Sequence, residues 1–268
     1  MPAAPSASQT KPPAALAPMR LPNGSTVVQL NPAETSLMYR DIVATRAYLQ
    51  HGLELGPGAT VFDVGANIGI STLFFHWEAE RTRVYAFEPV PLLFEALRAN
   101  VEAHGVAAVL FPCGLGREPG RVELTYYPDV TVMTSAYADP EHDAAVTRTF
   151  LENSGFAVDD VEDMMRDRHE TETLECEVRT LSDVLAEHRV ERVDLLKVNV
   201  EKAEGDVLAG IDERDWPKVH QLTMQVHDLG GRVESVRADL VRRGYAVAVD
   251  QDPLLAGTDI FDLYARRP

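Results

Sequence analysis

The stretch TVFDVGANIG, Thr60 to Gly69, decides the fold of this chain. Its first half, Thr60 to Val64, is an apolar and β-branched run typical of a buried strand, and it stops at a glycine loop. A helix is expected directly afterwards, from about Ile70 to Ala79. Gly65 and Gly69 remove side chains where the backbone must turn tightly and approach a ligand. Because open α/β sheets bind ligands outside the carboxyl ends of their strands, the loop predicts a binding site.

Strands and helices alternate beyond this loop. A strand is expected over Arg83 to Glu88, a helix over Pro91 to His104 and a third strand over Ala108 to Pro112. Further strands are expected at DLLKVNV (194–200) and LTMQVH (222–227), and the C-terminal stretch indicates a terminal hairpin. The alternation predicts an α/β fold with a mostly parallel sheet and helices on both faces.

Three segments flank or interrupt this pattern. Residues 1–19, rich in Pro and Ala, predict a disordered leader, which leaves 20–268 as a single domain. A hairpin around Asn23-Gly24 and a helix over 32–52 are expected next. The charged region from Asp129 to Glu172 predicts a helical insert that covers the carboxyl edge of the sheet as a lid. A strand over 175–179 and a helix after it are then expected to return the chain to the sheet.

Composition limits the partners of this protein. Its 268 residues carry a formal net charge of −17, which disfavours nucleic acids and anionic membranes, since both attract basic proteins. No apolar run reaches the 18 or more residues of a membrane span, and no secretory signal is recognisable. Cys113 and Cys176 match no metal-ligand spacing and indicate reduced thiols. These features predict a cytoplasmic protein with a small-molecule substrate, and they leave a homo-oligomer open.

The glycine loop predicts a nucleoside cofactor. Glu88 ends the next strand roughly 20 residues on, where a carboxylate that binds ribose is expected. A dinucleotide loop would favour a third glycine, whereas Asp63 repels a pyrophosphate and could pair with the amino group of S-adenosylmethionine (SAM). The exit of the third strand, Pro112 to Gly114, would flank the adenine. The expected cofactor residues are Asp63, Gly65, Ala66, Asn67, Gly69, Glu88, Cys113 and Gly114.

Four stretches of the sequence, the first of which contains the glycine loop, occur in the same order as in a known family. The stretches VFDVGANIGISTLFF, AFEPVP, LLKVNVEKAEGDVLAGI and QVHDLGGRVE resemble the FkbM methyltransferases. NPAETSLMYRDI and DQDPLLAGT are similar to the branch that methylates polyketide and peptide natural products. The resemblance implies SAM dependence and a Rossmann-like class I fold with a seven-stranded sheet, a C-terminal antiparallel hairpin and a helical lid insert. It also implies O-methylation of a hydroxyl on a macrolide or related metabolite.

Two departures from this family concern lost carboxylates. Asn199 stands where that branch usually has aspartate, and Gln225 stands where it usually has glutamate. Both weaken any role that needs negative charge, so no metal is expected. If a metal binds, Asn199, Glu201 and Asp228 are the candidate ligands, and an oxygen-only set suits magnesium. The departures also keep open a SAM-binding protein with impaired catalysis. N-methylation of a related metabolite is a separate alternative.

Methyl transfer to an alcohol requires alignment and a base, because the alcohol's proton must leave. His227 ends a predicted central strand and is the first candidate base. Glu201 ends the neighbouring strand and could orient His227 or act as the base itself. Asn199 is expected to hydrogen-bond the substrate or the methionine part of SAM.

The substrate pocket draws on other segments. Tyr39 from the helix near the N-terminus, together with Tyr127 and Met133 from the region of the insert, could line it. Ordinary core packing is the alternative role for each of these three residues.

Overall fold

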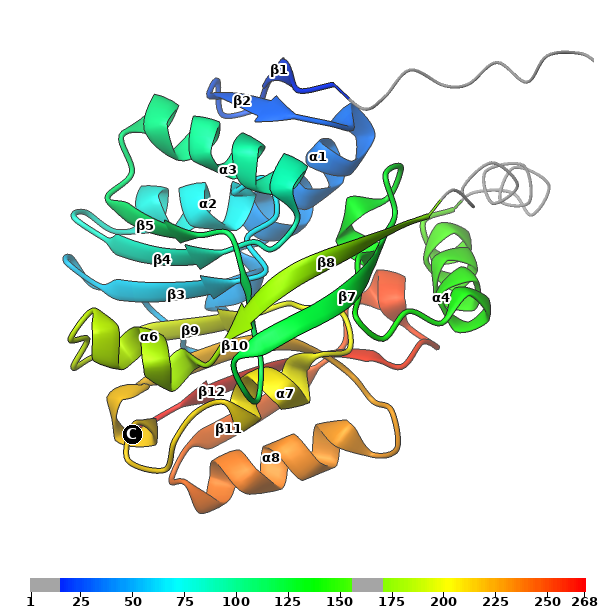
Figure 1. Cartoon of the computed structure of the whole chain (residues 1–268). Coiled ribbons are helices and arrows are strands. Elements are labelled where there is room, and N and C mark those ends of the chain that lie inside the picture. The colour runs from blue at the N-terminus through cyan, green and yellow to red at the C-terminus, as the bar shows by residue number, and fades with distance from the viewer. Residues whose placement is uncertain (1–14, 156–170) are drawn as a thin grey trace, which may run out of the picture.

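The computed structural model describes residues 15–155 and 171–268, and one seven-stranded sheet forms its centre (Figure 1). The strands are β3 (Thr60–Val64), β4 (Arg83–Phe87), β5 (Ala108–Phe111), β9 (Leu195–Val198), β10 (Gln221–His227), β11 (Ala246–Asp250) and β12 (Ile260–Arg266). Their order is β11-β12-β10-β9-β3-β4-β5. The neighbours from β10 to β5 are parallel, whereas β12 is antiparallel to both β10 and β11. The expected α/β fold and C-terminal hairpin are confirmed.

Helices cover both faces of the main sheet (Figure 1). One face carries α2 (Ile70–Glu78) and α3 (Pro91–His104), and the other carries α6 (Leu181–Glu187), α7 (Glu204–Ala209) and α8 (Arg232–Arg242). Along β3, Val61 packs into the core beneath α2 and α3, while Phe62 and Val64 pack into the opposite core. A strand covered on both faces favours apolar residues at successive positions, and Asp63 is the charged exception in β3.

A second, three-stranded sheet lies outside the main one. It comprises β6 (Gly114–Leu115), β7 (Gly120–Tyr126) and β8 (Glu172–Arg179), in the order β6-β8-β7. The expected strand over 175–179 forms as part of β8, but the prediction that it returns to the main sheet is wrong. Cys176 and Val178 are buried while Glu175 and Glu177 are exposed. This alternation is typical of a strand covered on one face only.

The N-terminal segment differs from its prediction in two places. The hairpin forms from β1 (Ala17–Arg20) and β2 (Thr26–Gln29), so 17–19, expected in the leader, lie in a strand. Residues 1–14 lie outside the described residues. The single helix expected over 32–52 is divided into α1 (Pro32–Met38), the π-helical η1 (Tyr39–Ala44) and the 3-10 turn η2 (Ala47–Leu49). Arg46 adopts a left-handed φ of 57°, which interrupts the helix.

The insert is described up to residue 155. It contains the short turn η3 (Thr131–Met133) and the helix α4 (Pro140–Asn153), and α4 packs against η5 (Pro253–Leu255) before β12. Asp139 caps α4 by accepting a hydrogen bond from the His142 amide at 3.2 Å. A last turn, η4 (Trp216–Lys218), precedes β10. Residues 156–170 of the insert lie outside the described residues, and among those described no helix is long and apolar enough to cross a membrane.

Candidate active site

A cavity of about 530 Å³ opens at the carboxyl ends of β3, β4 and β9. Its floor comes from the loops that follow these strands, over 64–67, 87–90 and 199–203. Its other walls come from the start of the small sheet (114–118), from β7 and β8, from the insert over 131–137 and from the N-terminal Met38, Ile42 and Tyr48. Parallel strands end at one edge of the sheet, so residues far apart in sequence meet here as expected.

The loop after β3 is packed against the loop after β9. Gly65 has a φ of +79°, and a Cβ atom there would lie 1.9 Å from the carbonyl oxygen of Asn199. Only glycine fits this position, because both the backbone angle and the contact exclude a side chain. The loop thereby presents Gly65, Ala66 and Asn67 to the cavity. Gly69, which directly precedes α2, does not line the cavity and packs instead against Leu97 of α3.

Glu88 lies on the cavity wall after β4, where sequence reasoning placed it. Its carboxylate accepts hydrogen bonds from the amide of Asn67 at 2.8 Å and from the amide of Val90 at 2.9 Å. Burial raises the pKa of Glu88 to about 7, although these two hydrogen bonds lower it. The two amides leave further lone pairs on the carboxylate, so it can still accept hydroxyl donors from a ligand.

Asp63 does not reach the cavity, which corrects its expected contact with the cofactor's amino group. The side chain is 0% exposed and forms an ion pair with Lys197 at 3.0 Å. It also accepts hydrogen bonds from the hydroxyls of Ser71 and Thr72 at 2.7 and 2.6 Å. Lys197 in turn donates to the carbonyl of Gly65 at 2.7 Å. Asp63 therefore fixes the glycine loop and the start of α2 from beneath.

Lys197 is a site residue that the sequence reasoning missed, and it does line the cavity. Burial lowers its pKa, but Asp63 and Tyr48 raise it by more, so the net shift is upward and the ammonium stays charged. Its nitrogen lies 5.4 Å from the centre of the Tyr48 ring. The available signal was a lysine inside the apolar strand DLLKVNV, since a buried charge needs a partner.

The two departures from the family pattern have different surroundings. Asn199 lines the cavity together with Tyr48. Gln225 instead faces Asp262 across the β10–β12 pair, away from the cavity. Burial raises the pKa of Asp262 to about 6. A glutamate at 225 would add a second carboxylate beside this buried acid, whereas the Gln225 amide can donate to it.

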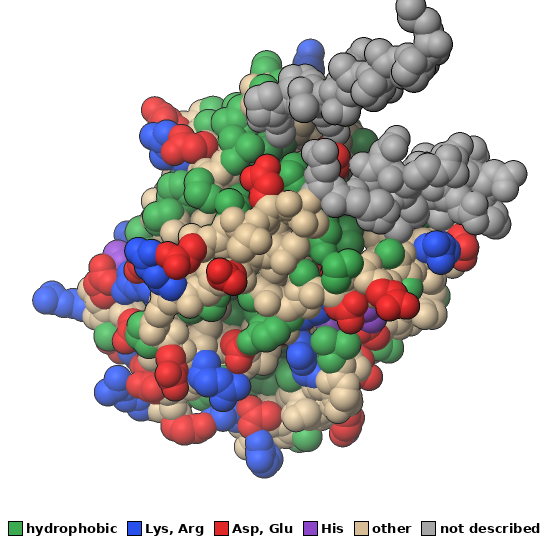
Figure 2. Space-filling model, turned by 45° about the vertical axis from the view of Figure 1, so that its right-hand side comes forward, with side chains coloured by type: hydrophobic (Ala, Val, Ile, Leu, Met, Phe, Trp, Pro, Cys, Tyr) green, Lys and Arg blue, Asp and Glu red, His purple; other side chains and the backbone are tan. Residues whose placement is uncertain are grey.

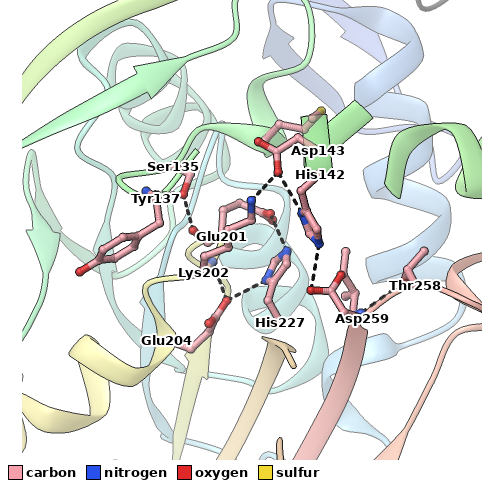
Figure 3. A network of polar contacts seen from close by, with 12 residues as sticks. Ser135, Tyr137, His142, Asp143, Glu201, Lys202, Glu204, His227, Thr258 and Asp259 are labelled. Carbon is pink, nitrogen blue, oxygen red and sulfur yellow. Dashed lines mark hydrogen bonds and ion pairs between the residues drawn. The ribbon is translucent and has the colours of Figure 1, made fainter. Parts of the chain in front are cut away.

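His227 is 3% exposed and does not line the cavity. Its Nδ1 lies 3.0 Å from Glu204 and its Nε2 lies 3.3 Å from Glu201 (Figure 3). Burial lowers the pKa of His227, but the hydrogen bonds and charges of the two glutamates raise it to about 10. Near neutral pH it is therefore an imidazolium with both nitrogens engaged, and a substrate hydroxyl cannot reach it in this geometry.

Glu201 does line the cavity, and its backbone is strained. Glu201 and Lys202 have φ values of 45° and 73°, the left-handed region that side chains disfavour. Ser135 of the insert donates a hydrogen bond to the Glu201 carbonyl at 2.6 Å (Figure 3). Lys202 pairs with Asp143 on α4, so the insert contacts this turn twice.

The expected substrate residues lie beside the cavity and not in its walls. Tyr39, Tyr127 and Met133 are absent from the lining, while their neighbours Met38, Val132 and Thr134 contribute to it. Tyr127 is buried and donates to Asp143 at 3.4 Å, in keeping with the packing role left open for it. Tyr39 and Met133 each lie one residue from a lining residue, because the π-helical η1 and the turn η3 do not keep the α-helical period.

The insert and the glycine loop share a hydrogen-bond chain that the sequence did not suggest. Asn67 donates from its side chain to the Thr131 hydroxyl at 3.0 Å, and that hydroxyl donates to Glu34 of α1 at 3.0 Å. The Val132 amide also donates to Glu34 at 2.9 Å. Hydrogen bonds of Thr131 therefore connect the wall formed by 131–137 to the predicted cofactor loop.

Of the remaining predicted residues, some line the cavity and others do not. Gly114 lines the cavity, whereas Cys113 is buried behind it, and both cysteines are free thiols. Asp228 accepts a hydrogen bond from the Val233 amide at 2.9 Å at the start of α8 and does not converge with Asn199. Within the described ranges, no group of three or more His, Cys, Asp or Glu residues could hold a metal ion.

The residues of the cavity fit SAM. A glycine loop that admits no Cβ follows the first central strand, and a buried carboxylate follows the next. Together with a parallel sheet interrupted by one antiparallel strand, β12, this is the architecture of class I methyltransferases. The chain is a SAM-dependent methyltransferase of that class.

Comparisons with known proteins agree and identify the family. Residues 63–247 match the model of the methyltransferase FkbM domain, and the chain belongs to this family. It is 44% identical over 250 residues, 93% of this chain and 96% of the relative, to the 31-O-demethyl-FK506 methyltransferase FkbM of Streptomyces tacrolimicus. It is 32% identical over 232 residues, 84% of this chain and 87% of the relative, to Methyltransferase 1 of Beauveria bassiana.

A solved structure shows the same fold at low sequence identity. Methyltransferase FkbM from Methylobacillus flagellatus KT superposes with a TM-score of 0.53 and is 14% identical. The match covers 84% of this chain and 47% of that one. The expected class I fold is thereby confirmed.

Proposed function

We propose that this methyltransferase transfers a methyl group from SAM to a hydroxyl of a small-molecule natural product of the polyketide or macrolide kind. The cavity carries this proposal, because its walls join the glycine loop to apolar side chains of β7 and of the insert. Val122, Val132 and Tyr137, which line it, are 36%, 37% and 53% exposed and present apolar surface to an incoming molecule. The relative at 44% identity is named as a 31-O-demethyl-FK506 methyltransferase.

The proposal assigns the cofactor to the loops at the sheet edge. Glu88 would hold the ribose hydroxyls, and the backbone of Gly65 to Asn67 would lie against the methionine part. Asn199 would hydrogen-bond the methionine part or the substrate, and Gly114 would flank the adenine. SAM supplies an activated methyl group when bound. The protein's part is then to align the hydroxyl in line with the methyl–sulfur bond, which provides about 7–11 kcal/mol of barrier reduction in favourable cases.

The insert is proposed as a lid. Residues 131–137 form one wall of the cavity, and α4 is fixed to the turn after β9 through Lys202 and Asp143. Limited proteolysis with and without S-adenosylhomocysteine (SAH) checks this role. Protection of the insert by SAH supports a lid, whereas equal cleavage in both samples contradicts it.

Several further expectations stay predictions and belong to the same proposal. The enzyme is proposed to be cytoplasmic and metal-independent, and to accept a free small molecule; a homo-oligomer stays open. On the face drawn in Figure 2, basic side chains are interspersed with acidic ones and do not gather in one patch. Together with the net charge of −17, this supports an acceptor other than nucleic acid.

Two measurements test the proposal. Calorimetric titration with SAH, with and without EDTA, tests the cofactor site; binding that EDTA does not change supports metal independence. Transfer of labelled methyl from SAM to 31-O-demethyl-FK506 and other hydroxylated macrolides tests the acceptor class, and mass spectrometry locates the methyl. Methyl on nitrogen would favour N-methylation, and SAH binding with no transfer to any of these acceptors would favour a SAM-binding protein.

A further inference from the structure

Proton removal is the part of the reaction that the cofactor does not supply. Formation of the oxygen–carbon bond breaks the carbon–sulfur bond, and the electron pair of that bond goes to sulfur. The hydroxyl proton must pass to a base, because the oxygen would otherwise carry a positive charge. This inference rests on the proposed O-methylation and asks which side chain of the described structure is that base.

The cavity is lined by four carboxylates among the described residues, Glu88, Glu118, Glu201 and Asp206. Glu88 is held by two backbone amides, in the place proposed for the ribose. Asp206 accepts from the hydroxyl of Tyr137 and from Arg117 at 3.3 Å, so two donors already occupy its carboxylate, whereas within the described part of the chain the Glu201 carboxylate contacts His227 alone. Glu118 is exposed on the loop after β6. Glu201 is the candidate that remains.

The position of Glu201 brings it close to the expected site of transfer. It follows Asn199 by two residues, and the carbonyl of Asn199 is packed against Gly65 of the glycine loop. Its side chain is 21% exposed, so the carboxylate meets the cavity while most of it is shielded. A carboxylate beside a sulfonium also favours the reaction, because transfer converts one positive and one negative charge into neutral groups in a medium of low dielectric constant.

We propose that Glu201 takes the proton of the acceptor hydroxyl, and that His227 and Ser135 are positioning residues that hold it. His227 contacts the Glu201 carboxylate through Nε2 and is itself fixed through Nδ1 by Glu204 (Figure 3). Glu204 also pairs with Arg232 at 2.7 Å. The new proton on Glu201 then leaves to water through the exposed part of its side chain.

The strained turn supports this assignment. Two successive non-glycine residues with positive φ are strained, and such strain persists only where surrounding contacts hold it. Here Ser135 binds the Glu201 carbonyl, Arg232 binds the Lys202 carbonyl at 2.7 Å, and Glu204 accepts from the Lys202 amide at 2.8 Å. These contacts hold the turn in a conformation that directs the Glu201 side chain to the cavity.

The kinetic test compares Glu201→Gln with Glu234→Gln, an exposed glutamate on α8, as the matched control. With 31-O-demethyl-FK506 as acceptor, Glu201→Gln is expected to lower single-turnover transfer about 10²–10⁴-fold. SAH affinity should stay within about threefold. His227→Gln removes the cation beside Glu201, so the acid limb of the rate profile should move to higher pH. A merely structural residue would not move that limb, and Glu201→Gln with near-normal transfer overturns the proposal.

A second measurement needs no acceptor. Carbon-13 NMR of glutamate-labelled protein bound to SAH, assigned with Glu201→Gln, reports whether the Glu201 carboxyl is ionised at pH 7.5. An ionised group supports the proposal, whereas a protonated one could not accept the hydroxyl proton and refutes it. If wild type leaves the macrolide unmethylated, the acceptor choice of the proposed function has failed, and this measurement still decides the state of Glu201.

Discussion

Substitution of Lys197 by methionine tests how the cofactor loop is held. Lys197 is 1% exposed and is the cation paired with Asp63, which is 0% exposed. Methionine keeps the length and apolar volume of the side chain but removes the charge and the donor to the Gly65 carbonyl. Asp63 would retain only the hydroxyls of Ser71 and Thr72.

The magnitude follows from this burial. Removing one partner of a fully buried ion pair costs about 3–5 kcal/mol, because the other charge is left uncompensated. For a chain of this length, each kcal/mol lowers the melting temperature by about 2 °C, so Lys197→Met should melt roughly 6–10 °C lower. Adding Asp63→Asn removes the stranded charge and should restore at least about 1.5 kcal/mol of the loss.

The assay is urea and thermal unfolding at pH 7.5, followed by SAH titration of the folded variants. Arg237→Met is the control, because Arg237 pairs with Glu234 at 2.8 Å on the surface, where the two side chains are 45% and 68% exposed. A change within about 1 kcal/mol is expected for this control. If Lys197→Met loses less than about 1 kcal/mol, or if Asp63→Asn makes it worse, the ion pair does not hold the loop as argued.

Three other predictions concern the same site. Gly65→Ala should lower the melting temperature more than Gly58→Ala does. Both positions have a φ near +80°, which costs about 1–2 kcal/mol for alanine, but only a Cβ at position 65 would meet a carbonyl oxygen, at 1.9 Å. Equal melting temperatures of the two variants would contradict this contact. Glu88→Gln should weaken SAH binding by about 1.5–3 kcal/mol in calorimetry, since charge-assisted hydrogen bonds are lost, and unchanged affinity would remove Glu88 from the ribose site. Burial raises the Glu88 pKa to about 7, so the contribution of Glu88 to the stability of the ligand-free protein falls as pH rises through 7. SAH affinity should rise from pH 6 to 8, because the carboxylate ionises over this range. An SAH affinity that is flat from pH 6 to 8 would refute the link between Glu88 ionisation and binding.

The sequence by itself determined the sheet and the place of the site. The apolar run of β3, the glycines after it and the acid after β4 are local patterns with fixed consequences, because parallel strands end at the same edge. For this reason Gly65, Asn67 and Glu88 lie at the cavity, as their spacing predicted. The terminal hairpin followed from the same kind of pattern.

Only the tertiary structure decided which polar groups face each other. Asp63 ends the strand where a cofactor contact was expected, yet Lys197 of the neighbouring strand takes its charge. His227 lies at the correct strand end, but Glu201 and Glu204 occupy both of its nitrogens. Periodicity reports which face of an element a residue occupies, whereas its partner depends on which other elements pack against that face. Because these groups are buried, the charge and role of each depend on its partner, and no local sequence pattern identifies that partner.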